Sequence, residues 1–406
     1  MKKLVLPTLF LFLTAGASLA QIAYGGQGNR MAYGGQEKET NNSEYLLLNR
    51  SLQFSITEAI NSLYNFDFEK AERGFLVMSY SYPEHPLPYF LMGLSQWWKI
   101  APDTRNEEYD ALFHKYMEAA IDKAEALLEA DSENKEAAFF LAAAYGFQGR
   151  LYSERKSWTK AAFAGKNALN YLELSRGDEE LNAELLLGDA LFNYFSVWIP
   201  ENYPLLRPMM LLFAKGDKEL GIKQLEEVSA NAFYARVEAQ YFLFRLYASE
   251  ERKPYEALRI TSYLHEKFPH NPYFHRFYAR QLYAVGRLPE AKDESLAILQ
   301  RIADGWTGYE ANSGRYGAFF AAQYFDRINQ LEQAKKYYEQ AVAFGAEAET
   351  EDSGYHLFSL VHLGEIALKT GENKKAKAYF NQVKKLAKRK HPAHKEARNF
   401  LKENKL

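Results

Sequence analysis

The chain has 406 residues, of which 47% are hydrophobic and 25% charged, and it contains no cysteine. This composition is typical of a folded protein with a large core, and the length exceeds that of one compact domain unless the chain is a repeat array. The lack of cysteine excludes disulfides, thiolate catalysis, cysteine metal ligands and a lipid-modified N-terminal cysteine.

Residues 1–20 have the features of a secretory signal peptide. Two lysines precede a mostly apolar run from Leu4 to Leu13, and small side chains occupy Ser18 and Ala20. The apolar run is short for a membrane span. Without residues 1–20 the chain carries 48 basic and 52 acidic residues, a balance that argues against a nucleic-acid partner. We therefore expect an exported protein of the periplasm or cell envelope.

Residues 21–43 are polar and glycine-rich and contain AYGGQ twice, which predicts a flexible linker. Residues 44–230 follow as an irregular series of helix pairs. In the first pair, Ala71, Phe75 and Met78 have the i, i+4, i+7 spacing of one helix face. Later helices in this region are longer, and a proline-rich segment interrupts the series.

Residues 231–406 predict a more regular series, and Leu363–Val383 is its clearest pair. Leu363, Gly364 and Ala367 mark one face of a first helix, and Gly371 breaks the chain. Ala376, Phe380 and Val383 mark one face of a second helix. We expect the two small residues to let the backbones approach while Phe380 fills the space beside them, and a last amphipathic helix, Ala393–Asn404, to cap the stack.

These spacings resemble those of the tetratricopeptide repeat family over roughly residues 52–388. The family places a leucine, a small residue and an aromatic residue on the first helix of a pair, and Ala, Phe, Ala and Pro on the second. The resemblance implies an all-α fold, a helical-hairpin solenoid of about eight irregular repeats with a C-terminal capping helix.

Members of this family bind peptides on the concave face made by the first helices, and the resemblance assigns nine residues to that face. These are Tyr241, Arg245, Tyr273, Arg276, Arg280, Tyr283, Tyr316, Gln323 and Arg327. Arginine forks bind carboxylates and tyrosines supply stacking area, so an extended acidic peptide or a C-terminus would fit. The alternative is that these side chains pair with one another and with acids such as Glu238 and Asp326. The equivalent positions of the first two pairs are apolar and expected to be buried: Ile56, Ile60, Leu63, Phe90, Leu94 and Trp97.

Three further segments have alternative interpretations. Trp198–Met210 mixes prolines with large apolar residues, so it either contacts a partner or, as we favour, packs onto its own helices. Trp306 and Tyr309 in a glycine-rich loop have the composition of a sugar-stacking site, but we favour a simple inter-repeat connection. From Lys374 onward there are twelve basic and two acidic residues, which either associate with anionic lipid or an acidic partner or form a solvated helix face.

No catalytic motif occurs, and the nine histidines are scattered. His391 and His394 lie three residues apart, a weak metal spacing with no acid on the same face. We therefore expect no enzymatic activity, no cofactor and no metal. The predicted function is an exported, non-catalytic scaffold that binds a protein or peptide; the alternative is a carbohydrate-binding protein of the cell envelope.

Overall fold

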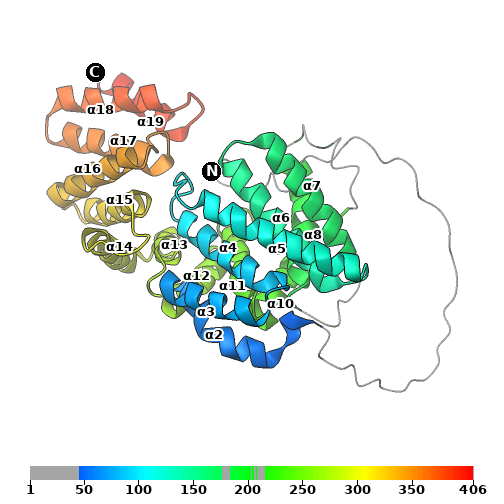
Figure 1. The fold of residues 1–406 in the computed structure, drawn as a ribbon. Coiled ribbons are helices and arrows are strands. Elements are labelled where there is room, and N and C mark those ends of the chain that lie inside the picture. The colour runs from blue at the N-terminus through cyan, green and yellow to red at the C-terminus, as the bar shows by residue number, and fades with distance from the viewer. Residues whose placement is uncertain (1–44, 176–182, 203, 205–206, 208–214, 406) are drawn as a thin grey trace. The chain divides into compact units, whose positions relative to one another are not determined.

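The computed structural model describes residues 45–175, 183–202, 204, 207 and 215–405. In that part of the chain every regular element is a helix (Figure 1), so the predicted all-α class is confirmed. The predicted signal peptide (1–20) and linker (21–43) lie outside the described residues, as does much of Trp198–Met210.

The chain divides into two compact units at Leu243 and Phe244, with two short earlier segments, Asn61–Phe68 and Trp97–Glu107, belonging to the second unit. The helices up to the division are α2 (Arg50–Tyr64), α3 (Phe68–Ser81), α4 (Pro86–Ile100), α5 (Asp110–Ala130), α6 (Lys135–Glu154), α7 (Trp158–Ser175), α8 (Leu186–Asn202) and α10 (Lys218–Asn231). Helix α11 (Arg236–Ser249) crosses it, and the others are α12 (Pro254–Lys267), α13 (Pro272–Ala284), α14 (Leu288–Ala303), α15 (Ala311–Arg327), α16 (Leu331–Glu347), α17 (Gly354–Lys369), α18 (Asn373–Leu386) and α19 (Pro392–Glu403).

One three-residue turn joins the two helices in five of the pairs, namely α2/α3, α6/α7, α13/α14, α15/α16 and α17/α18. Its middle residue has a positive φ in every case: Phe66, Lys156, Gly286, Asn329 and Gly371. In the last pair, Gly371 N donates to Leu368 O at 3.1 Å and Glu372 N donates to Ala367 O at 2.7 Å. The bond from Glu372 spans five residues, as in a Schellman motif, and it satisfies carbonyls that the helix end would leave unpaired.

The pair α17/α18 packs as its spacing predicts. Ala376, Phe380 and Val383 are fully buried on one face of α18. A Cβ atom added to Gly364 would lie 2.5 Å from Phe380 Cε1, so only glycine allows the ring to sit against α17. The prediction that Phe380 fills the space beside Gly364 is therefore confirmed, and the small residue makes room for this ring and not for the backbone of α18. The pair continues into α19, which buries Ala393 and Ala397 in the same core.

The first unit has longer helices, with 21 residues in α5 and 20 in α6. Two buried carboxylates fasten its irregular segments. Glu136 on α6 accepts bonds from Leu46 N at 3.1 Å and Leu47 N at 2.6 Å. Glu184 accepts bonds from three successive backbone N–H groups ahead of α11, those of Phe233, Tyr234 and Ala235. In the first unit, irregular segments are thus held by hydrogen bonds to carboxylates that are far away in the sequence, whereas the second unit has short connections between its helices.

Candidate functional site

The nine residues assigned to the binding face fall in both units. Tyr241 belongs to the first unit, where its hydroxyl accepts a bond from Arg150. The other eight belong to the second unit. On α13, Tyr273, Arg276, Arg280 and Tyr283 are spaced by three, four and three residues, so the helix places them on one face. Tyr316, Gln323 and Arg327 share α15 at intervals of seven and four.

Residues of a binding face are expected to be exposed, and this expectation is wrong for four of the nine. Tyr241, Tyr273, Arg276 and Tyr316 are buried, because their rings and stems pack against neighbouring repeats. Arg245, Arg280, Tyr283 and Gln323 are partly buried, and Arg327 is exposed. The six apolar positions of the first two pairs behave as expected, with Phe90 partly buried and the other five buried.

The charged side chain of Arg276 is enclosed by its neighbours, and only 4% of the residue is exposed. Its Nη1 donates to Pro102 O at 3.1 Å, and it lies 3.3 Å from both Glu310 Oε1 and Ser313 Oγ. Glu310 in turn caps α15 by accepting bonds from the backbone N–H groups of Asn312 and Ser313. Arg276 therefore fastens α13 to the start of α15.

Positive charge gathers around Tyr316. Burial by itself raises the pKa of its phenol, yet four guanidinium groups outweigh that effect and lower it: Arg280, Arg276, Arg315 and Arg245. Of these, Arg315 was not among the residues assigned from the sequence, because its position next to Tyr316 maps to a different face of an ideal helix. Tyr355 on α17 was also missed; its ring centroid lies 4.8 Å from that of Tyr316.

Arg280 and Arg327 are the two cations of this face that remain available. Within the described residues neither side chain forms an ion pair or a hydrogen bond; Arg280 lies over the Phe277 ring, 5.5 Å from its centroid. Arg327 lines a pocket of about 580 Å³ at the C-terminal ends of α13 and α15, together with Tyr283, Gln323 and Asp326. Tyr283 Oη donates to Gln323 Oε1 at 3.0 Å, which fixes the pocket wall.

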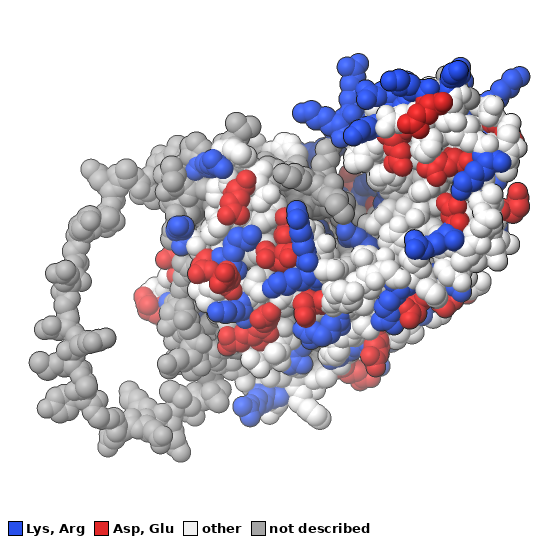
Figure 2. Space-filling view, turned by 180° about the vertical axis from the view of Figure 1, so that it is seen from behind, with Lys and Arg blue, Asp and Glu red and all other residues white. Residues whose placement is uncertain are grey.

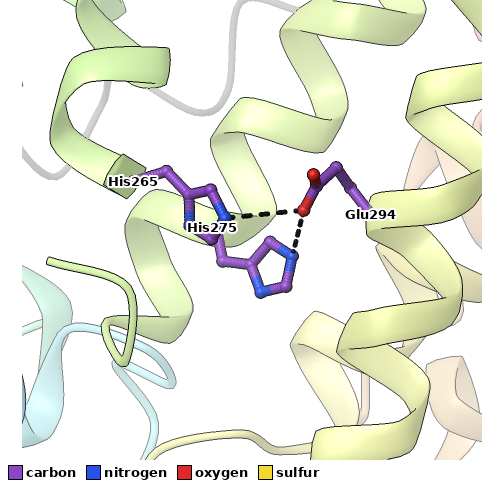
Figure 3. A group of neighbouring side chains, drawn as sticks. All are labelled: His265, His275 and Glu294. Carbon is purple, nitrogen blue, oxygen red and sulfur yellow. Dashed lines mark hydrogen bonds and ion pairs between the residues drawn. The ribbon is translucent and has the colours of Figure 1, made fainter. Parts of the chain in front are cut away.

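A second group of polar side chains lies on three successive helices of the same unit (Figure 3). His265 comes from the last turn of α12, His275 from the first turn of α13 and Glu294 from α14. His275 Nε2 is 2.9 Å from Glu294 Oε2, and His265 Nε2 is 3.5 Å from the same oxygen. The two imidazole rings stack with centroids 4.3 Å apart. Sequence reasoning missed this group because its members lie ten and nineteen residues apart.

The protonation states of this group follow from its burial. Burial lowers the pKa of His275 to about 4, although its hydrogen bond to Glu294 acts in the opposite direction. Burial would raise the pKa of Glu294, but hydrogen bonds from His265 and His275 outweigh it and lower that pKa to about 2. At neutral pH a carboxylate thus faces a neutral imidazole of His275.

The remaining sequence candidates are placed as follows. Trp306 is 38% exposed and Arg301 lies over its ring, whereas Tyr309 is buried, so the two do not form an open aromatic platform. Trp198, at the start of the proline-rich segment, is buried. His391 Nδ1 accepts a bond from Ala393 N and caps α19.

Lysine and arginine side chains crowd the end of the second unit that α18 and α19 form (Figure 2). No helix in the described part of the chain is long and apolar enough to span a membrane.

A family model described as tetratricopeptide repeat matches residues 318–344 and 359–390, which contain most of α15, α16, α17 and α18. No curated protein sequence matches the chain. Among solved structures, the chain is similar to yeast Tom70, at 15% identity and a TM-score of 0.36 over 78% of this chain and 63% of that one. It is also similar to the TPR domain of P58(IPK), at 12% identity and a TM-score of 0.24 over 87% and 99% of the two chains. The chain thus spans less than two thirds of the Tom70 chain.

The family match falls on the region that the sequence marks as most regular, and in that region the small residues and Phe380 pack as the repeat pattern requires. Repeats of this family serve in general as scaffolds for contacts between proteins. The chain thus contains tetratricopeptide repeats in residues 318–344 and 359–390.

Proposed function

We propose that this chain is an exported, non-catalytic scaffold that binds a carboxylate-bearing segment of a protein partner on the α13–α15 face of its second unit. The observation that carries the proposal is the excess of positive charge around Tyr316, whose pKa is lowered in spite of its burial. An acidic side chain or a C-terminal carboxylate would reduce this excess. Guanidinium groups bind carboxylates with two parallel hydrogen bonds, which also fixes the orientation of the ligand.

The residues of this face have separate tasks. Arg276 holds the start of α15 through Glu310 and is a support of the face rather than a ligand contact. Arg280 and Arg327 have no such partner within the described residues, so they supply the ligand contacts. Tyr283 and Gln323 line the pocket beside Arg327 and provide hydrogen-bonding groups for a peptide backbone.

The test begins with affinity capture of partners from the native cell envelope, followed by binding measurements on synthetic peptides from the captured protein. Each peptide is made with a free and with an amidated C-terminus. We expect Arg280→Ala and Arg327→Ala each to weaken binding by about tenfold or more, since a hydrogen bond to a charged group contributes about 1.5–3 kcal/mol.

Arg287→Ala is the matched control, because Arg287 is an exposed arginine of the same unit that already pairs with Glu290 at 2.7 Å. Its binding should equal that of the unmodified chain. Peptide binding that neither Arg280→Ala nor Arg327→Ala changes would remove the α13–α15 face from the proposal. Export is tested separately by sequencing the N-terminus of the protein from an envelope fraction, which should begin at Gln21.

A further inference from the structure

Three side chains that could bind a metal converge at the joint between α12, α13 and α14. The ligand atoms of His265, His275 and Glu294 all lie within 4.8 Å of one another. Local structure fixes their positions. Asn271 accepts bonds from Tyr273 N and Phe274 N and so sets the start of α13, from which His275 projects.

We propose that His265, His275 and Glu294 form a binding site for one divalent transition-metal ion, with Zn²⁺ as the occupant that fits the donors best. Two imidazoles and one carboxylate are a recurrent zinc ligand set, completed by water at the fourth position. Hard cations such as Mg²⁺ and Ca²⁺ instead prefer sites made of oxygen atoms.

The distances fit such an ion after small side-chain movements. With metal–ligand bonds of about 2.0–2.1 Å, neighbouring ligand atoms of a tetrahedral zinc site are about 3.3 Å apart. The two distances from Glu294 Oε2 to the imidazole nitrogens, 2.9 and 3.5 Å, lie on either side of this value. A metal would therefore lie between the Glu294 oxygen and the two imidazole nitrogens that already face it (Figure 3).

Without a metal, His275 donates its Nε2 proton to Glu294, and a contact on the other side of the ring can accommodate the tautomer that a metal requires. Metal binding at Nε2 moves the ring proton to Nδ1, and no proton leaves the protein. His275 Nδ1 lies 2.9 Å from Tyr309 Oη, which can accept that proton's hydrogen bond. Such partners orient ligand imidazoles in metal sites. Arg301 also donates to Tyr309 Oη, and its Nη1 lies 3.5 Å from His275 Nδ1, so its charge is on the side of the ring away from Nε2.

The site is open on one side. The His275 side chain is fully buried, whereas those of His265 and Glu294 are 16% and 28% exposed. Solvent can therefore deliver the ion and supply the remaining water ligand. A bound ion would link α12, α13 and α14 and hold α13, and with it Arg276 and Arg280, in one position. The metal would therefore stabilise the packing of these three helices.

The experiment titrates the metal-free full-length chain, carrying no histidine tag, with ZnCl₂ in a calorimeter and with CoCl₂ in an absorption spectrometer. We expect saturable binding of one Zn²⁺ per chain and the intense visible bands of cobalt in a low-symmetry site, and no saturable binding of Mg²⁺. Glu294→Gln and His265→Gln should each weaken Zn²⁺ binding by about 100-fold, and Tyr309→Phe by about tenfold.

His394→Gln is the matched control, since it removes a histidine of the C-terminal pair and leaves the cluster intact. It should bind Zn²⁺ as the unmodified chain does. His265 and Glu294 are partly exposed, so their variants are expected to fold, and the nitrogen NMR shifts of the His265 and His275 rings in the unmodified chain give a second measurement. Absence of saturable binding, binding that survives both ligand substitutions, or ring shifts that Zn²⁺ leaves unchanged would each overturn the proposal.

Discussion

Helices α17 and α18 of the second unit meet through a glycine and a phenylalanine that are close in sequence, whereas the first unit holds Phe233–Ala235 through Glu184, some fifty residues away in the chain. Both units nevertheless use the same three-residue turn, which appears at Lys156 in the first unit and at Gly371 in the second. The turn within a pair is therefore shared, whereas the helix lengths and the connections between pairs differ. Regular repeats need small residues at recurring positions, while irregular ones need individual polar caps.

The largest effect is expected from emptying the core of the regular region. Phe380→Ala should lower the free energy of unfolding of α17–α19 by about 3–5 kcal/mol, because it removes a fully buried ring. Each repeat contacts mainly its neighbours, so hydrogen exchange should rise in α17–α19 and not in α5–α7. The control is Phe163→Ala on α7, where the ring is exposed and the change should stay within about 0.5 kcal/mol. Exchange that rises equally in both units would contradict this local behaviour.

The matching change in the first unit removes a distant cap. Glu184→Ala leaves three backbone N–H groups, one buried and two partly buried, without their acceptor, and we expect a loss of about 3 kcal/mol in the free energy of unfolding of the first unit. Denaturation followed by hydrogen exchange of α11 measures it. Glu227→Ala on the exposed side of α10 should change stability by less than about 0.5 kcal/mol. A loss no larger than that of the control would show that Glu184 is not needed as a cap.

A third substitution tests the close approach of α17 and α18. Gly364→Ala should destabilise the second unit by about 2 kcal/mol, because the added methyl group overlaps the Phe380 ring. Gly354→Ala is the comparison, since a Cβ at that position meets no atom within 4 Å and should be neutral or slightly stabilising. Thermal unfolding of both variants measures this difference in stability. Equal melting temperatures would contradict the predicted overlap at Gly364.

Acid should weaken both units through two histidines, of which His356 is buried and His114 is partly buried. Burial lowers the pKa of His356 in the second unit and of His114 in the first. As the pH falls through about 6.5, the unfolded chain takes up protons before these folded groups do, so stability is full above that pH and is lost on acidification. His356→Asn should flatten the acid dependence of the second unit, and His114→Asn that of the first. Acid profiles that neither variant changes would refute the assignment.

The smallest effect concerns the shared turn. Lys156→Gly should stabilise its pair by up to about 1 kcal/mol, because a lysine at positive φ carries strain that glycine lacks. Gly371→Ala should cost about 1 kcal/mol for the same reason. Chemical denaturation measures the change in the free energy of unfolding of both variants. A gain for Lys156→Gly and a loss for Gly371→Ala would show that the turn favours glycine in both units. Changes of the same sign would contradict this.

Much of the regular region could be predicted because its determinants are local. The spacing of Ala376, Phe380 and Val383 requires only one helix, and their burial followed from it. The proposed binding face was harder to predict, since the burial of Tyr316 depends on Tyr355 in the next repeat. Burial set by a neighbouring repeat leaves no signal in the spacing of one helix.

Contacts between distant residues left even less signal. His265, His275 and Glu294 come from three helices, and no short motif joins them. The hydrogen bonds of Glu136 and Glu184 to backbone groups about ninety and fifty residues away likewise depend on the folded path of the chain. Periodicity reports which face of a helix is buried, but not which polar groups meet across separate helices.

The common turn also bears on how such a chain changes over evolutionary time. Because a single positive-φ residue closes the joint at five places, a helix on either side can lengthen or shorten by a full turn while the joint stays intact. Insertions and deletions in multiples of about 3.6 residues keep the same face toward the core. The 20-residue α6 ends at such a turn, and segments bounded by these turns are natural units for grafting between proteins.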